Sequence, residues 1–349
     1  MEVAYFSPER FIETGHVFKE RMLGAVAFGA ERPHVASPDF PFAWIDMPLL
    51  GREGTVFEVW LSEDPVVRDD AHGIAAARND DVLFGCIEIG QQTTLDATSY
   101  LAYSRIFDFI DSREYGHLLR VWNYFPGINN DADGLERYQR FCRGRHEAFV
   151  AKGRVVSNDA PAACALGTRS GSLVVYFLAA RRAGQRVENP RQLSAYHYPE
   201  QYGPRSPTFS RAMLAPRAAE DALLFISGTA GIVGHETQHV GNAAEQARET
   251  AANVLAVIEE ARRAGLEFAT SKGQLSMKAY LRRPEFLPIV RDALVQAFGP
   301  GTDVVYLQAD ICRSDLLLEV EAVYAETARV EKALPAACAE TAGGVGMNE

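Results

Sequence analysis

The chain has 349 residues, of which 47% are hydrophobic and 23% are charged, and its formal net charge is −11. This composition can fill one or two hydrophobic cores, which excludes a disordered chain, and its acidic balance argues against general nucleic-acid binding. Five scattered cysteines without a CxxC pair, no signal-peptide pattern and no long apolar run predict a cytoplasmic protein with reduced thiols and no membrane span.

The first 130 residues are predicted to be mostly β-structure. Short apolar runs bounded by Gly, Asp and Pro, such as TVFEVWL (55–61) and DVLFGCIEI (81–89), are typical of strands. A helix is expected from Ala97 to Ile110. RVWNYFPGINN (120–130) then predicts a strand that enters a Pro-Gly turn.

The middle of the chain begins with an amphipathic helix. Apolar residues at 3-4-3 spacing predict it from Gly134 to Lys152, with Gly153 ending it. Two strands follow, ACALGT (163–168) and SLVVYFLAA (172–180). The next 32 residues (181–212) form an irregular stretch rich in Tyr, Arg, Pro and Gly. Irregular segments of this length are usually functional or disordered, and the aromatic residues favour a functional loop.

From Asp221 onwards the pattern indicates an α/β unit of about 120 residues. Two short strands are expected in DALLFISGTAGIVG (221–234), and a helix from Ala243 to Ala264 with Gly265 as its terminating residue. A strand at 277–282, a helix at 284–298 stopped by Gly299, and closing strands at 303–312 and 316–325 complete the unit. The Ala- and Gly-rich tail after residue 330 is expected to fray.

Glu319 is the main candidate for acid–base chemistry. In the closing strand LLLEVEAVYA, alternation places Glu319 and Glu321 on the same face. One interpretation is an edge strand with a solvated face. The other is a carboxyl group in an apolar pocket, where burial raises its pKa and lets it donate a proton near neutral pH. The sequence pattern favours neither over the other.

Two pairs of Tyr and Arg are candidates for binding an anion. Tyr138 and Arg145 lie seven residues apart on one face of the predicted helix, and Tyr198 and Arg211 repeat these residue types in the long loop. A guanidinium beside a phenol suits a carboxylate ligand. Because the protein is acidic overall, an anionic substrate needs such local Arg clusters.

The segment SGTAGIVGHETQHVG (227–241) is rich in glycine and small residues and precedes a helix, so it is a candidate anion-binding nest. It lacks the spacing of either common nucleotide-binding motif. His235 and His239 resemble an HExxH zinc motif only if they are helical, and the flanking Gly234 and Gly241 argue against a helix. We therefore predict no metal site here.

Several long motifs resemble the chorismatase family. They are VWNYFPGINN, LERYQRFCRGRHEAF, SAYHYPEQYGP, FISGTAGIVGHETQHVGN and ADICRSDLLLEVEAVY, which span residues from about 119 to 324. The resemblance implies an α/β (α+β) fold of two YjgF/RidA-like halves, each a mixed β-sheet packed with helices. The implied division is 1–150 for a degenerate N-terminal domain, 151–330 for the catalytic domain and 331–349 for a flexible tail.

The resemblance also implies roles for individual residues. Glu319 matches the catalytic glutamate, and Tyr138, Arg145, Tyr198 and Arg211 match substrate-binding positions. Two further positions separate subfamilies, and this chain has Gly231 and Cys312 there. That combination is similar to the type that forms 3-hydroxybenzoate, although a subfamily giving both 3- and 4-hydroxybenzoate, and hydrolysis to a dihydroxycyclohexadiene carboxylate, stay open.

The expected reaction is therefore the conversion of chorismate to 3-hydroxybenzoate and pyruvate, with Glu319 protonating the enolpyruvyl methylene and Cys312 steering the outcome. This chemistry calls for no cofactor and no metal. The alternatives are a YjgF/RidA-like imine deaminase, against which the absence of an Arg in DVVYLQAD (303–310) weighs, and a small-molecule-binding protein. Monomer and homo-oligomer both stay open.

Overall fold

Three β-sheets form the centre of the structure, a computed structural model that describes residues 1–35, 38–216, 223–264 and 274–325. The first has the order β1-β4-β2-β3 and consists of β1 (Glu2–Phe6), β2 (Met22–Gly29), β3 (Phe42–Asp46) and β4 (Thr55–Leu61). The second has the order β11-β8-β12-β7-β6-β5 and consists of β5 (Val67–Arg68), β6 (Ile74–Arg78), β7 (Val82–Ile89), β8 (His117–Pro126), β11 (Ala162–Thr168) and β12 (Leu173–Ala180).

The third sheet has the order β13-β14-β15-β20-β18-β19 and consists of β13 (Gln185–Val187), β14 (Ala212–Leu214), β15 (Leu223–Thr229), β18 (Gln274–Leu281), β19 (Asp303–Gln308) and β20 (Leu318–Ala325). Two small ribbons pair β9 (Asp131–Ala132) with β10 (Leu135–Glu136), and β16 (Ile232–Val233) with β17 (Glu236–Thr237).

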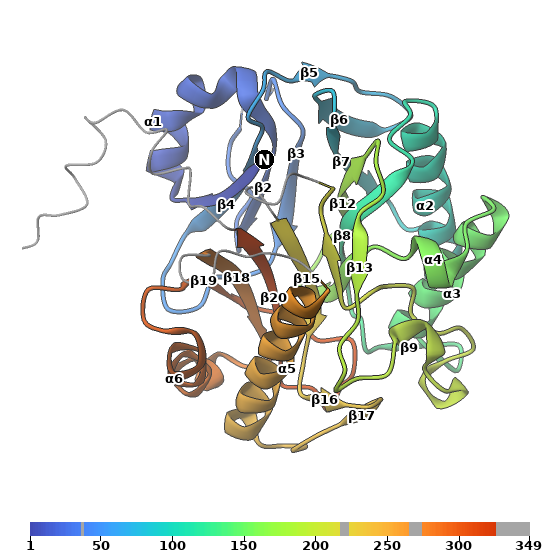
Figure 1. Cartoon of the computed structure of the whole chain (residues 1–349), viewed down its shortest axis with the longest axis vertical. Coiled ribbons are helices and arrows are strands. Elements are labelled where there is room, and N and C mark those ends of the chain that lie inside the picture. The colour runs from blue at the N-terminus through green and yellow to red at the C-terminus, as the bar shows by residue number, and fades with distance from the viewer. Residues whose placement is uncertain (36–37, 217–222, 265–273, 326–349) are drawn as a thin grey trace, which may run out of the picture.

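Helices cover the outer face of each sheet. Figure 1 shows them on three sides of the central strands: α1 (Pro8–Phe18), α2 (Leu95–Asp111) with α3 (Arg137–Ala151) and α4 (Val156–Asp159), and α5 (Ala243–Arg263) with α6 (Leu287–Phe298). The short 3₁₀ turns are η1 (Lys19–Arg21), η2 (Ala195–His197), η3 (Glu200–Tyr202) and η5 (Pro284–Phe286). Within the described residues, no helix is both long and apolar enough to cross a membrane.

Each helix layer shares an apolar core with its own sheet, and the inner faces of the three sheets share a fourth core. That central core includes Trp60 of β4, whose ring centroid lies 5.4 Å from that of Trp122 on β8 and 6.1 Å from that of Phe225 on β15. Burial of large aromatic side chains dominates core energetics. The three sheets are therefore locked together, and residues from different sheets can build one site.

A buried ion cluster lies where the three sheets meet. Lys278 of β18 contacts the carboxylates of Glu58 on β4 and Glu321 on β20, and Arg120 of β8 forms an ion pair with Glu321. All four side chains are almost fully buried. The hydroxyl of Tyr176 accepts from Lys278 Nζ at 2.8 Å. Because each charge has a partner of opposite sign, the cluster avoids the cost of an uncompensated buried ion.

The helices predicted from periodicity are confirmed, because α2, α3 and α5 cover the expected ranges. Their ends follow local chemistry: Thr94 and Asn242 cap α2 and α5 through their side chains, and Gly153 lies beyond α3 with φ of +69°. The prediction of an almost all-β N-terminal region is wrong in one respect. It omits α1, which Ser7 caps and Pro8 begins.

The mixed α/β class is confirmed, with sheets packed against helices. The division of the chain at residue 150 stays a prediction. Strands β11 and β12 come after residue 150 in the chain, yet β11 pairs with β8 and β12 pairs with β7, which both come before it. The expected terminating residue Gly265 and the tail 331–349 lie outside the described residues.

Candidate active site

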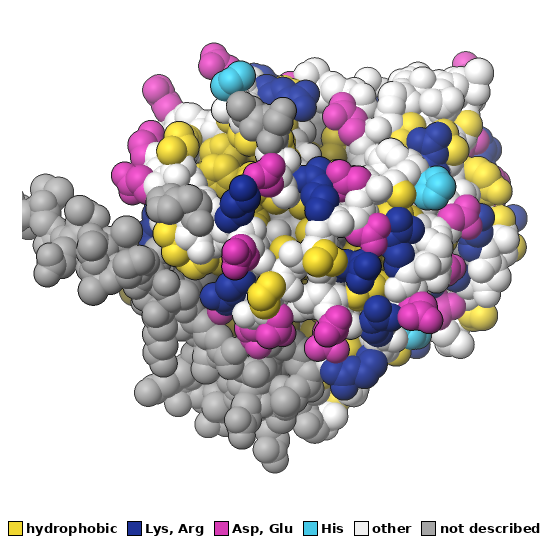
Figure 2. Space-filling model, turned by 90° about the horizontal axis from the view of Figure 1, so that it is seen from above, with side chains coloured by type: hydrophobic (Ala, Val, Ile, Leu, Met, Phe, Trp, Pro, Cys, Tyr) yellow, Lys and Arg dark blue, Asp and Glu magenta, His cyan; other side chains and the backbone are white. Residues whose placement is uncertain are grey.

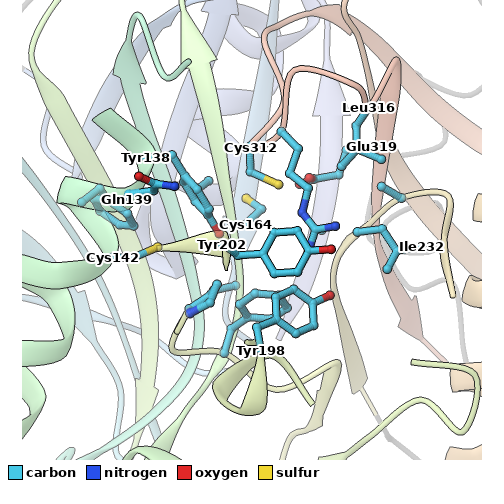
Figure 3. A pocket seen from close by; sticks show the side chains of 18 of the residues that line it. Tyr138, Gln139, Cys142, Cys164, Tyr198, Tyr202, Ile232, Cys312, Leu316 and Glu319 are labelled. Carbon is cyan, nitrogen blue, oxygen red and sulfur yellow. The ribbon is translucent and has the colours of Figure 1, made fainter. Parts of the chain in front are cut away.

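A cavity of about 260 Å³ lies between the second and third sheets. Helix α3, strands β11, β15 and β20, the loop around η2 and η3, and the segment before β20 contribute its walls. Figure 3 shows Glu319 and Tyr138 entering it from opposite sides, with Cys312 between them. The cavity brings together six of the seven predicted site residues: Tyr138, Arg145, Tyr198, Arg211, Cys312 and Glu319.

Glu319 lies on β20, a central strand that pairs with β15 on one side and β18 on the other. Its side chain is buried, and Oε1 has no hydrogen-bond partner among the described residues. Burial, and secondly the negative charge of Glu321, raise the pKa of Glu319 to about 8. The interpretation as a solvated edge residue is therefore wrong, and Glu319 is mostly protonated at pH 7.

The two glutamates of β20 differ in charge because their partners differ. The pKa of Glu321 is lowered to about 2: Lys278 and then Arg120 outweigh the opposing effect of burial. Glu321 is therefore a fixed anion on the same strand face as the neutral Glu319. Such a pair, with pKa values pushed apart by environment, is typical of acid–base sites.

Gly228 leaves the space that the Glu319 carboxyl occupies. A Cβ atom at position 228 would lie 2.0 Å from Oε1 of Glu319 and 2.7 Å from its Cδ. The glycine belongs to β15, where the register with β20 shifts between Ile226 and Thr229. The glycine-rich pattern at 227–241 indicated an anion nest and gave no sign of this role for Gly228.

The two Arg residues of the predicted pairs present unpartnered N–H groups. The Arg211 Nη2 donates to the hydroxyl of Tyr198 at 2.8 Å and to the carbonyl of Leu193 at 2.6 Å, while its Nε has no partner among the described residues. Arg145 lies over the ring of Tyr103 at 4.8 Å, and within the described parts of the chain its Nε and one Nη are buried without hydrogen-bond partners. Buried unpaired guanidinium groups are suited to an anionic ligand.

The Tyr138 hydroxyl and the Cys312 thiol are uncharged. Burial raises the pKa of Tyr138 well above its ordinary value. Burial, and then the nearby Glu319, raise the pKa of Cys312. Cys312 is thus a neutral thiol, which is a weak nucleophile compared with a thiolate.

Gly231 does not line the cavity, although its neighbours Ala230 and Ile232 do. A Cβ atom at position 231 would point towards α5 and lie 3.3 Å from the Cα of Gln246. Gln246 in turn holds both the carbonyl of Asp315 and the N–H of Leu317 through its side chain. Gly231 therefore packs against Gln246, which holds the segment before β20, and its role in the reaction stays a prediction.

Arg313 is a third cavity cation, which the sequence analysis did not assign to the site. Its guanidinium lies 3.8 Å from the ring centroid of Tyr202 and 5.1 Å from that of Tyr198. One Nη donates to the carbonyl of His235 at 2.8 Å, and the other is buried without a partner among the described residues. Its position directly after Cys312 is the feature of the sequence that could have identified Arg313 as a site residue.

Figure 2 shows one face of the molecule, where acidic and basic side chains are interspersed over the surface. Residues 236–237 form strand β17, in agreement with the prediction that the HETQH segment is not helical. Among the described residues, no group of three or more His, Cys, Asp or Glu side chains is arranged to hold a metal ion.

Comparison with known proteins places this geometry in context. Residues 58–179 match a family model described as the N-terminal region of FkbO/Hyg5-like chorismatases. The chain is 38% identical to a 3-hydroxybenzoate synthase of Streptomyces hygroscopicus, with 76% of this chain and 80% of that protein covered. It is 42% identical to a chorismatase of Streptomyces rapamycinicus, with 77% and 82% covered. A crystal structure of a chorismatase superposes with a TM-score of 0.83 at 35% identity, covering 92% of this chain and 97% of that one.

Proposed function

Because this chain belongs to the chorismatase family, we propose that it converts chorismate into 3-hydroxybenzoate and pyruvate. The observation that carries the proposal is a protonated, buried glutamate facing a cavity that three guanidinium groups line. The substrate class follows from those charges. Chorismate is a dianion with an enol ether, and it needs both cationic anchors and a proton donor.

The three guanidinium groups account for binding the two carboxylates of chorismate. Arg145 with Tyr138 lies on the α3 side of the cavity, and Arg211 with Tyr198 lies on the loop side. Arg145 and Arg211 both keep free N–H groups for the ligand. Two separate clamps fix the ring between them, and such positioning converts binding energy into rate.

Glu319 would act as the general acid of the first step. Its proton passes to the methylene carbon of the enolpyruvyl group, which generates an oxocarbenium ion and makes pyruvate a good leaving group. General acid catalysis of this kind contributes roughly 10²–10⁴-fold. A carboxyl with its pKa raised to about 8 keeps that proton at neutral pH.

The C4 hydroxyl of the substrate would then displace pyruvate from C3. The hydroxyl oxygen forms a bond to C3 and loses its proton, the C3–O bond to pyruvate breaks, and an arene oxide results. Opening of the C4–O bond, protonation of the oxygen that stays on C3 and loss of the C3 proton give 3-hydroxybenzoate. Of the two protons released, from the C4 hydroxyl and from C3, one ends on that oxygen and the other restores Glu319. All atoms of chorismate appear in the two products, so no water or other reactant is consumed.

Cys312 is placed to influence where the ring opens. It lines the cavity beside Glu319 as a neutral thiol, so its role is steric and through weak hydrogen bonding, without a covalent intermediate. Gly231 would act indirectly, through Gln246 and the segment before β20. Both residues thus influence the product through the same wall of the cavity.

Incubation of the purified protein with chorismate tests the proposal. Pyruvate is followed by coupled reduction with lactate dehydrogenase, and the ring product is identified by chromatography and NMR. We expect pyruvate and 3-hydroxybenzoate in equal amounts. A mixture with 4-hydroxybenzoate, or a dihydroxycyclohexadiene carboxylate, would contradict the product assignment, and absence of pyruvate would contradict the reaction.

The combined variant Cys312→Val, Gly231→Ala tests product control. We expect its ring product to include compounds other than 3-hydroxybenzoate while pyruvate is still released. If the variant makes only 3-hydroxybenzoate, these two residues do not determine the product.

A further inference from the structure

Arg282 makes an unusual set of contacts directly behind the cavity wall. It follows the last residue of β18, and its side chain is 16% exposed. Its guanidinium forms five hydrogen bonds: Nε donates to Leu316 O at 2.9 Å, Nη1 to Asn129 Oδ1 at 3.1 Å and Asp310 Oδ1 at 2.6 Å, and Nη2 to Ile311 O at 3.2 Å and Arg313 O at 2.9 Å. These partners surround one short segment of chain.

That segment is residues 311–317, which lie in neither a helix nor a strand. Within the segment, only the carbonyl of Leu317 accepts a ladder-type backbone hydrogen bond from β18, where the N–H of Arg282 donates to it at 3.0 Å among the described residues. A buried carbonyl outside a sheet needs another donor. The Arg282 side chain supplies donors to three carbonyls of the segment, and Gln246 holds the carbonyl of Asp315 at 2.9 Å from the opposite side. The planar guanidinium has five N–H donors in a fixed fork, so it imposes one geometry on the backbone it binds.

The same segment carries five consecutive residues of the cavity wall, from Cys312 to Leu316. Glu319, also in the wall, is the second residue of the strand that follows. A change in backbone geometry at 311–316 would therefore move the thiol and the third guanidinium relative to bound substrate. Arg282 itself is not part of the cavity lining.

We propose that Arg282 is a positioning residue of the active site, which holds the 311–317 segment so that Cys312 and Arg313 face the substrate. Its catalytic consequence rests on the proposed chorismatase reaction, whereas its effect on the segment does not. The role differs from simple stabilisation because two of the carbonyls that Arg282 binds belong to the wall residues Arg313 and Leu316, and the third belongs to Ile311, directly before Cys312.

The test compares Arg282→Gln with Arg283→Gln. Arg283 is the adjacent residue, its side chain is 64% exposed, and its ion-pair contact is with Glu285 at 3.9 Å. We expect Arg282→Gln to lower kcat about 100-fold, since a displacement of about 1 Å in an active site has that effect, and to change KM less. We also expect ring products other than 3-hydroxybenzoate, because the Cys312 thiol is displaced. Arg283→Gln should match the unmodified protein.

A second measurement needs no substrate. Cys312 is half-buried, and its modification by a thiol reagent can be followed by peptide mass spectrometry. We expect the modification rate of Cys312 to rise at least about tenfold in Arg282→Gln, while that of buried Cys86 stays unchanged. If Arg282→Gln fails to fold, Arg282→Lys, which keeps the charge but loses the fork, should show the same changes to a smaller degree.

The proposal is overturned if a folded Arg282 variant matches Arg283→Gln in all three measurements: kcat, the ring product and the modification rate of Cys312. Failure of the reaction itself gives a different pattern, in which neither the unmodified protein nor Arg283→Gln releases pyruvate from chorismate. In that case the Cys312 modification rate still decides whether Arg282 holds the segment.

Discussion

Replacing Gly228 with alanine places a methyl group where the Glu319 carboxyl now lies. The added Cβ would be 2.0 Å from Oε1 of Glu319, about 1 Å closer than any tolerable contact, and 3.1 Å from Cβ of Cys164. Alanine fits the backbone of Gly228, so the effect is steric and falls on Glu319. A displacement of about 1 Å at the reacting group is expected to lower kcat roughly 100-fold, and overpacking to cost about 1–3 kcal/mol of stability.

Pyruvate release from chorismate measures this effect, with thermal unfolding recorded in parallel. Gly90→Ala is the matched control, because a Cβ at the exposed Gly90 meets no atom within 4 Å. We expect Gly228→Ala to stay folded with little activity and Gly90→Ala to be unaffected. Near-normal turnover in Gly228→Ala would refute the reasoning that Glu319 must occupy this position.

Two further predictions concern ionisation. Because the pKa of Glu319 is raised to about 8, kcat/KM should be limited by loss of its proton above pH 8, falling about tenfold per pH unit; a rate that is constant to pH 10 would contradict this. The same raised pKa of Glu319 contributes stability that is present below pH 4.5 and is lost as the pH rises to about 8. The free energy of unfolding of Glu319→Gln, measured with denaturant at pH 7, should therefore exceed that of the unmodified protein by up to about 3 kcal/mol. Lys278→Met leaves the carboxylates of Glu58 and Glu321 buried without their shared cation and should lower the free energy of unfolding by about 3–5 kcal/mol. Lys152→Met breaks an exposed pair with Asp108 and should lower it by less than about 1 kcal/mol. Equal losses in the two variants would show that the buried cluster is unimportant.

Much of the fold could be predicted because local pattern and tertiary burial agree. Helices α2, α3 and α5 have apolar stripes and chemical signals at their ends. Strand β12 is a continuous apolar run, and β7 and β20 are apolar apart from their glutamates. Helix α1 was missed although Ser7 and Pro8 form a recognisable start. How the three sheets pack depends on contacts between residues far apart in the chain, such as Lys278 with Glu58, and no local pattern encodes these.

The site was partly predictable for a similar reason. Residue type and family resemblance identified Glu319 and the two Tyr/Arg pairs, and the structure brings them to one cavity. The roles of Gly228 and Arg282 could not be read from sequence. The role of Gly228 depends on the atoms of Glu319 that an added side chain would contact, and these are known only from the folded structure. The Arg282 hydrogen bonds likewise depend on how the 311–317 segment folds.

The proposed reaction depends on a proton that Glu319 donates, and the activity of Glu319→Gln tests this dependence. Glu319→Gln keeps the size of the side chain and its place on β20 but has no acidic proton to donate. We expect the folded variant to bind chorismate and to release pyruvate at least about 100 times more slowly than the unmodified protein. Turnover within a few fold of the unmodified protein would contradict the assignment of Glu319 as the acid.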